Sequence, residues 1–158
     1  MLLDRQLLER TRARHERPPV TVVVGGCGAG RTERLRRVER DLGLDRAQYI
    51  DVERVATTPE RCYEAIRRES PFSGGPADAP VGTRDAFDAL LTFLMTARGR
   101  DGGPAIFLLD EVLDVRTFES FPGLRAAQAE LARAVAHSPN TFVLASRFEA
   151  RARCRRSS

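Results

Sequence analysis

The sequence predicts an α/β fold: a three-layer sandwich in which a mainly parallel sheet is flanked by helices. Short apolar runs rich in β-branched residues alternate with segments of helical periodicity, and no internal repeat is present. Because parallel strands need crossover connections, this alternation favours helices on both faces of the sheet. The chain has 158 residues, 42% of them hydrophobic, so residues 1–158 are expected to form one domain with its own core.

Four segments are expected to form strands, namely residues 20–24, 49–52, 105–109 and 141–145. Three helices are expected over residues 2–15 (within an N-terminal segment 1–17), over 31–42, and from Pro59 to about Ser70. Two more are expected from apolar residues at helical spacing. One contains Phe87, Leu90, Leu91, Leu94 and Met95 and ends at Gly99, and the other contains Leu124, Ala127, Leu131 and Val135. Thr58 and Pro59 suit an N-cap and a first helical position. Residues 71–84, rich in proline and glycine, are expected to form an exposed, mobile loop.

Composition excludes several classes of protein. The three cysteines are far apart and form no CxxC pair, so neither a disulfide framework nor a zinc site is predicted and a reducing, cytoplasmic setting is expected. No apolar run is long enough to span a membrane. The net charge is +4, and all 26 basic residues are arginine, including those of a basic tail at 149–158. The two histidines, His15 and His137, suggest no site.

A glycine-rich segment follows the first predicted strand and precedes a predicted helix. It reads Gly25-Gly26-Cys27-Gly28-Ala29-Gly30-Arg31-Thr32. This matches the phosphate-binding pattern G-x-x-x-x-G-K-[ST] except that Arg31 replaces lysine. Glycines let main-chain N–H groups approach phosphate oxygens, and the start of a helix favours an anion. The segment is therefore predicted to bind the phosphates of ATP, with the Thr32 hydroxyl on Mg²⁺.

The third predicted strand ends in two adjacent acids, Asp110 and Glu111. Ligands of open α/β sheets bind at the carboxyl ends of the strands, so both acids are expected to face the nucleotide. Asp110 is predicted to hold the hydrated Mg²⁺, and Glu111 to orient or deprotonate the water that attacks the γ-phosphate. Asp114 is expected to be a surface or capping acid.

Together these segments resemble the P-loop ATPases that have an added strand between the P-loop strand and the Walker B strand, a division containing the AAA+ and STAND ATPases. The resemblance covers about residues 20–148. Residues 141–147 resemble the sensor strand of that division, which implies that Arg147 reaches the γ-phosphate. Residues 49–66 are also similar to ATPases of the origin-licensing type.

The sequence departs from that family in two places. Arg31 keeps the charge of the family's lysine but is bulkier and planar, so binding is expected to survive better than hydrolysis. The chain also stops soon after the sensor strand, where the family continues into a fifth strand and a helical lid. The chain is therefore expected to be a fragment of a longer ATPase, or a domain that a protein partner completes. In either case its affinity for nucleotide is expected to be weak.

The leading hypothesis is slow, Mg²⁺-dependent ATP hydrolysis coupled to a conformational change. The alternative is a non-hydrolysing, nucleotide-responsive interaction module, which Arg31 and the absent lid favour. Nucleic-acid binding through arginines ranks lower, because acidic residues are interspersed and no aromatic stacking platform is visible. A GTPase is disfavoured by the absence of an Asn-Lys-x-Asp segment, and a small-molecule kinase by Glu111, which suits water activation.

Overall fold

The computed structural model describes residues 20–24 and 30–146, so the expected helix at 2–15, the loop residues 25–29, Arg147 and the basic tail lie outside the described residues. The strands are β1 (Val20–Val24), β2 (Ala47–Asp51), β3 (Ile106–Asp110) and β4 (Thr141–Ser146). The helices are α2 (Arg31–Leu42), α3 (Val52–Val55), α4 (Pro59–Glu69), α5 (Thr83–Thr96), the 3₁₀ helix η1 (Val112–Ser120) and α6 (Ala127–His137).

The four strands form one parallel sheet in the order β1-β4-β3-β2. Strand β4, the last in sequence, therefore lies between β1 and β3, which confirms the expected added strand between the P-loop strand and the acid-bearing strand. Since all pairs are parallel, the carboxyl ends of β1 and β3 lie at the same edge of the sheet. The glycine-rich segment and the acids thus belong to one edge.

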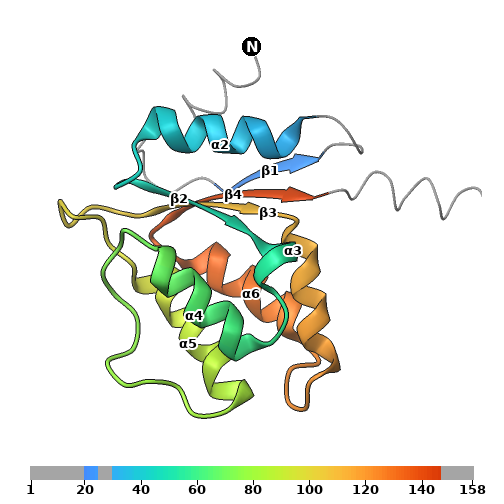
Figure 1. Cartoon of the computed structure of the whole chain (residues 1–158). Coiled ribbons are helices and arrows are strands. Elements are labelled where there is room, and N and C mark those ends of the chain that lie inside the picture. The colour runs from blue at the N-terminus through green and yellow to red at the C-terminus, as the bar shows by residue number, and fades with distance from the viewer. Residues whose placement is uncertain (1–19, 25–29, 147–158) are drawn as a thin grey trace, which may run out of the picture.

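Helices cover both faces of the sheet, as expected (Figure 1). Helix α2 lies on one face, and α3 to α6 lie on the other. Strand residues alternate between the two sides, so Ile106 and Leu108 pack with Leu35 and Val38 of α2, whereas Phe107 packs in the larger core. The same alternation places Asp110 on the α2 side of the sheet. Its side chain can therefore contact the first residues of α2.

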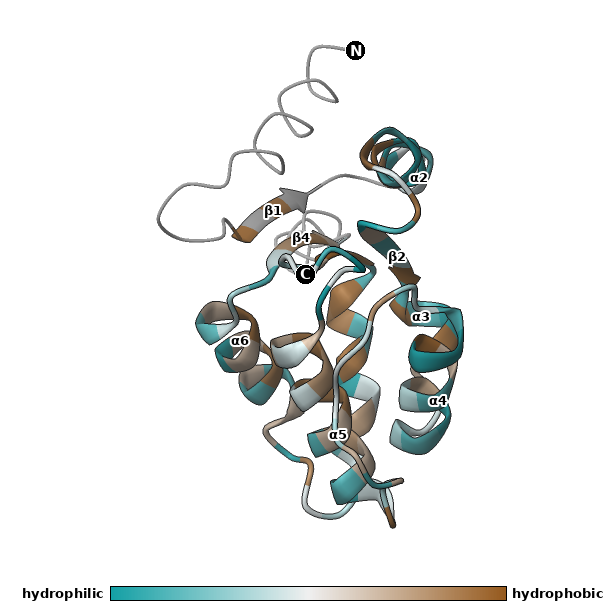
Figure 2. Cartoon of the chain, turned by 90° about the vertical axis from the view of Figure 1, so that its left-hand side faces the viewer, coloured by the Kyte–Doolittle hydropathy of each residue, from teal (hydrophilic) through white to brown (hydrophobic). Residues whose placement is uncertain are grey.

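The larger core is centred on Phe107 of β3, which is fully buried. Its ring stacks on Phe142 of β4 at a centroid distance of 5.4 Å and meets Phe72 and Phe93 edge-on at 5.2 and 5.8 Å. These offset and edge-to-face arrangements are the ones that aromatic rings prefer. Figure 2 shows the resulting pattern, with hydrophobic residues of α5 in the interior and hydrophilic residues on the outer side of α4.

Several element boundaries differ from the sequence expectation. Strand β2 begins at Ala47 and ends at Asp51, one residue before the expected end, because the Asp51 side chain accepts a hydrogen bond from Arg54 N (3.3 Å) and caps the short helix α3. Helix α2 matches its expected bounds. Thr58 caps α4 as predicted, accepting from Arg61 N at 3.2 Å.

Two further expectations need correction. Helix α5 ends at Thr96 rather than at Gly99, since the following residues pair with the loop after α4 through the bridge Ser73–Arg98. Leu124 is buried as expected but precedes α6, in a turn where its carbonyl accepts from Ala127 N at 3.1 Å. The 3₁₀ helix η1 was not expected, because its nine residues lack a clear period.

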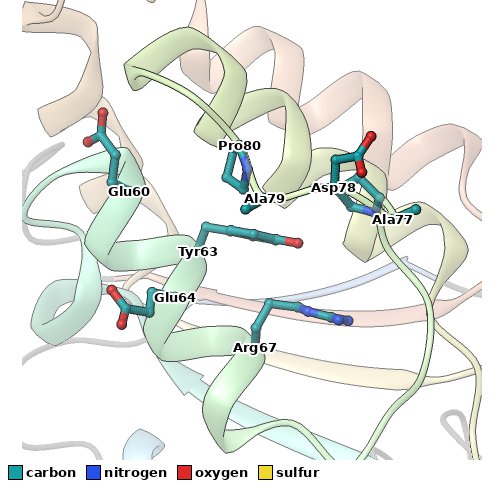
Figure 3. A pocket seen from close by; sticks show the side chains of 9 residues that line it. Glu60, Tyr63, Glu64, Arg67, Ala77, Asp78, Ala79 and Pro80 are labelled. Carbon is teal, nitrogen blue, oxygen red and sulfur yellow. The ribbon is translucent and has the colours of Figure 1, made fainter.

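The connection between α4 and α5 is partly packed into the protein, although its proline and glycine content predicts an exposed loop. Phe72 is buried against Phe107, and Thr83 and Arg84, expected in the loop, belong to α5. The rest of the connection arches over α4 and leaves a pocket of about 460 Å³ (Figure 3). The tyrosine in this pocket, Tyr63, lies on α4. Mobility of this loop stays a prediction.

Among the described residues, no helix is long and apolar enough to cross a membrane.

Candidate functional site

The first two residues of α2 meet the end of β3. Arg31 and Thr32 open α2, Asp110 is the last residue of β3, and Glu111 follows it. The structure therefore brings together these four residues, which the two sequence motifs predict as site residues. They meet even though β4 lies between β1 and β3. Gly30, just before them, has φ +66°, a conformation that glycine adopts without strain.

The Asp110 carboxylate accepts four hydrogen bonds and is almost completely buried, with 2% of its surface exposed. Oδ2 accepts from the Thr32 hydroxyl at 2.6 Å and from the Tyr49 hydroxyl at 2.7 Å. Oδ1 accepts from Arg31 Nε and from the Glu111 main-chain N–H, both at 3.1 Å. A carboxylate has about four lone-pair positions, so its orientation is fixed by its neighbours.

Arg31 spans both acids with one edge of its guanidinium group. Nε contacts Asp110, and Nη2 donates to Glu111 Oε1. The side chains are largely removed from water, with 9% of Arg31, 2% of Asp110 and 13% of Glu111 exposed. Charged hydrogen bonds in such surroundings are stronger than in water.

Glu111 has a left-handed backbone, with φ 54° and ψ 43°. A non-glycine residue in this region is uncommon and is a form of backbone strain that concentrates at functional sites. The turn is held by Asp114 N, which donates to the Glu111 carbonyl at 2.9 Å. This turn starts η1 directly after β3 and keeps the Glu111 carboxylate beside Arg31.

Tyr49 is a site residue that sequence reasoning missed. It lies on β2 opposite Leu108, on the α2 side, and its hydroxyl reaches Asp110. Burial, and then the hydrogen bond to Asp110, raise the pKa of the Tyr49 hydroxyl well above its ordinary value, so it stays protonated and donates. Arg36 lies over its ring at 4.0 Å, and Glu39 accepts from its main-chain N–H at 2.7 Å.

The sequence gives part of a signal for Tyr49, although the partner of its hydroxyl depends on the strand order. A tyrosine inside an otherwise buried strand needs a partner for its hydroxyl. Tyr49 lies two residues before the end of β2, on the same side as Asp51, which pairs in register with Asp110. That spacing directs a long side chain toward the end of the neighbouring strand.

The remaining predicted site residues lie outside the described part of the chain. They are Gly25, Gly26, Cys27, Gly28 and Ala29 of the glycine-rich segment, and Arg147 after β4. Strand β4 itself is present and ends at Ser146. The roles of these residues stay predictions.

Comparison with known proteins agrees with the fold. The Walker-type ATPase of Pyrococcus abyssi is structurally similar, with a TM-score of 0.55 and 18% identity over 91% of this chain and 43% of that one. The Aeropyrum pernix ORC2 protein, solved in ADPNP-ADP complexes, matches with a TM-score of 0.51 and 17% identity over 98% of this chain and 42% of that one. The fold is that of the P-loop ATPases. No protein-family model and no curated protein matches the sequence.

The chain spans less than half the length of these two proteins. At such low identity the likeness concerns the P-loop ATPase fold alone, because one fold can carry many functions.

The oxygen groups at the start of α2 fit a magnesium ion. Mg²⁺ prefers oxygen ligands and usually binds through one or two carboxylates together with substrate phosphates, keeping several waters. The Thr32 hydroxyl and the Asp110 carboxylate provide such oxygens within 2.6 Å of each other. No cluster of three or more acids, histidines or cysteines suited to a metal occurs among residues 20–24 and 30–146.

Proposed function

We propose that this chain binds ATP with Mg²⁺ and hydrolyses it slowly, coupling the reaction to a conformational change. The observation that carries the proposal is the contact between Thr32 and Asp110, 2.6 Å long, at the carboxyl edge of a parallel sheet with Glu111 beside it. A hydroxyl at the start of a helix and a strand-end acid are the groups that P-loop proteins use for a nucleotide and its metal.

Each residue has a distinct part in this proposal. Main-chain N–H groups of residues 25–31 surround the phosphates, where the start of α2 favours negative charge. Thr32 and Asp110 hold the metal and its water ligands. Glu111 takes a proton from the attacking water or orients it. Bound Mg²⁺ would neutralise charge that develops on the phosphoryl oxygens.

Arg31 and Arg147 supply positive charge in the proposal. Arg31 pairs with phosphate oxygens through its planar fork once it leaves the acids. Arg147 directly follows β4, whose position between β1 and β3 places that strand's end near the middle of the same edge. We assign it a contact with the γ-phosphate.

A protein partner, or a lid and effector domain, is proposed to complete the nucleotide site. The chain corresponds to 42–43% of the length of the similar ATPases, which leaves more than half of each without a counterpart here.

Titration calorimetry and a phosphate-release assay test the proposal together. Mg²⁺-ATP is expected to bind at one site per chain, and phosphate is expected to appear slowly and only with Mg²⁺. Absence of both binding and turnover, in protein shown to be folded by circular dichroism, would contradict it.

One observation favours the alternative of a nucleotide-responsive module that does not hydrolyse ATP. Arg31 binds both acids, so Glu111 is engaged by a cation at the position from which it would activate water. Binding of ATP and of its non-hydrolysable analogue with equal affinity, and no phosphate release over many hours, would favour the module.

Replacing Tyr49 by phenylalanine is expected to raise the Mg²⁺ concentration needed for half-maximal ATP binding by about tenfold, since groups that orient metal ligands commonly contribute that much. The change removes the 2.7 Å hydrogen bond to Asp110 Oδ2 and leaves the ring in place. Calorimetry over a series of Mg²⁺ concentrations measures the shift.

The matched control is Tyr63→Phe, at the chain's other tyrosine. Tyr63 lies in the pocket of Figure 3 on α4, on the opposite face of the sheet from α2, and so away from Asp110 and Glu111. Equal Mg²⁺ dependence in both variants would exclude a role for Tyr49 in orienting Asp110.

A further inference from the structure

We propose that Arg31 acts as a stand-in cation in the nucleotide-free site, so that a divalent metal binds only together with a nucleotide. This inference rests on the proposed function and concerns the regulation of the same site. It is motivated by the shared contact of one guanidinium edge with Asp110 and Glu111.

The two acids need a cation when no metal is present. Both carboxylates are largely buried, and isolated charges in such places are costly. Arg31 provides this positive charge: its Nε donates to Asp110 and its Nη2 donates to Glu111. A lysine ammonium is a compact point charge without this planar edge, so the geometry depends on arginine.

A metal ion alone cannot easily replace Arg31. The ion would compete with Arg31 Nε for the Asp110 carboxylate, and the guanidinium group, itself only 9% exposed, would lose that ion pair while staying buried. Breaking a buried pair in this way is strongly unfavourable.

A nucleotide with its metal satisfies all the groups at once. Phosphate oxygens offer Arg31 new anions that suit its bidentate geometry, and the metal then compensates the acids. Release of Glu111 from Arg31 accompanies this exchange, so the contact between them no longer competes with the action of Glu111 on water once ATP has bound. The exchange predicts positive coupling between metal and nucleotide.

Binding of Mn²⁺ in the absence of nucleotide tests the proposal, with free Mn²⁺ counted by electron paramagnetic resonance. The wild type is expected to bind Mn²⁺ at least about tenfold more weakly than Arg31→Met, a factor within the usual range of coupling between sites. Arg31→Gln, which also removes the charge, serves if the methionine variant does not fold. The matched control is Arg40→Met, at an exposed arginine in the last turn of the same helix, which should behave as wild type.

The outcomes separate this inference from the proposed function. Equal Mn²⁺ affinity of wild type and the folded Arg31 variants would overturn the stand-in role, even if the wild type binds and hydrolyses ATP. Tighter Mn²⁺ binding by the variants would support it, even if ATP binding failed. An equal gain in Arg40→Met would also overturn it, because the effect would then come from net charge alone.

Discussion

Replacing Glu111 by glutamine is expected to lower the rate of phosphate release by at least about 100-fold, the usual contribution of a general base. Glutamine keeps the size of the side chain and an oxygen that can accept from Arg31, but it cannot take a proton from water. Nucleotide affinity should change little, because Asp110 and Thr32, which are proposed to hold the metal, are unaltered. Phosphate release and calorimetry on the same preparation measure the two effects separately.

Asp114→Asn is the matched control for this prediction. Asp114 lies on η1, three residues after Glu111. Asp114→Asn removes one negative charge, as Glu111→Gln does. Its variant is expected to hydrolyse ATP at the wild-type rate. Equal rates in wild type and Glu111→Gln would remove Glu111 from the mechanism, and an equal loss in both variants would point to local charge rather than to base catalysis.

Replacing Phe107 by alanine is expected to lower the free energy of unfolding by about 3–5 kcal/mol, as for other large-to-small changes at buried aromatic residues. Phe107 is fully buried and contacts Phe72, Phe93 and Phe142. The cavity would lie in β3, three residues before Asp110, so the site should lose order along with the core. Urea unfolding followed by circular dichroism measures the change.

Phe121→Ala provides the comparison. Phe121 is only partly buried, after the end of η1, with its ring 6.5 Å from that of Phe118. Its loss should cost less than half as much as the loss of Phe107. If both variants lost the same free energy, the core would not be centred on β3 as described.

The predictable part of this fold follows from simple periodicities. Alternating β-branched runs and amphipathic segments identify the four strands, and glycine after Leu42 marks the end of α2. A strand-end pair of acids and a glycine-rich turn then point to one edge, because parallel strands all end at the same edge of the sheet. The expected proximity of Arg31, Thr32, Asp110 and Glu111 depends only on that topology.

The features that could not be predicted from the sequence are short helices and contacts that depend on side-chain geometry. Helix α3 has four residues and is held by the Asp51 cap, and η1 is a 3₁₀ helix, so neither produces a clear amphipathic period. The bond between Tyr49 and Asp110 requires knowing which strand lies beside β3. The contact of Arg31 with both acids could not be predicted either, because the motif assigns that position to phosphate.

A structure determined with ADPNP and Mn²⁺, with the metal located by its anomalous scattering, tests the central claim most directly. One nucleotide is expected at the start of α2, with Mn²⁺ between the Thr32 hydroxyl and the Asp110 carboxylate, and Arg31 turned from the acids to the phosphates. A nucleotide bound elsewhere on the protein, or a metal distant from both Thr32 and Asp110, would contradict the account.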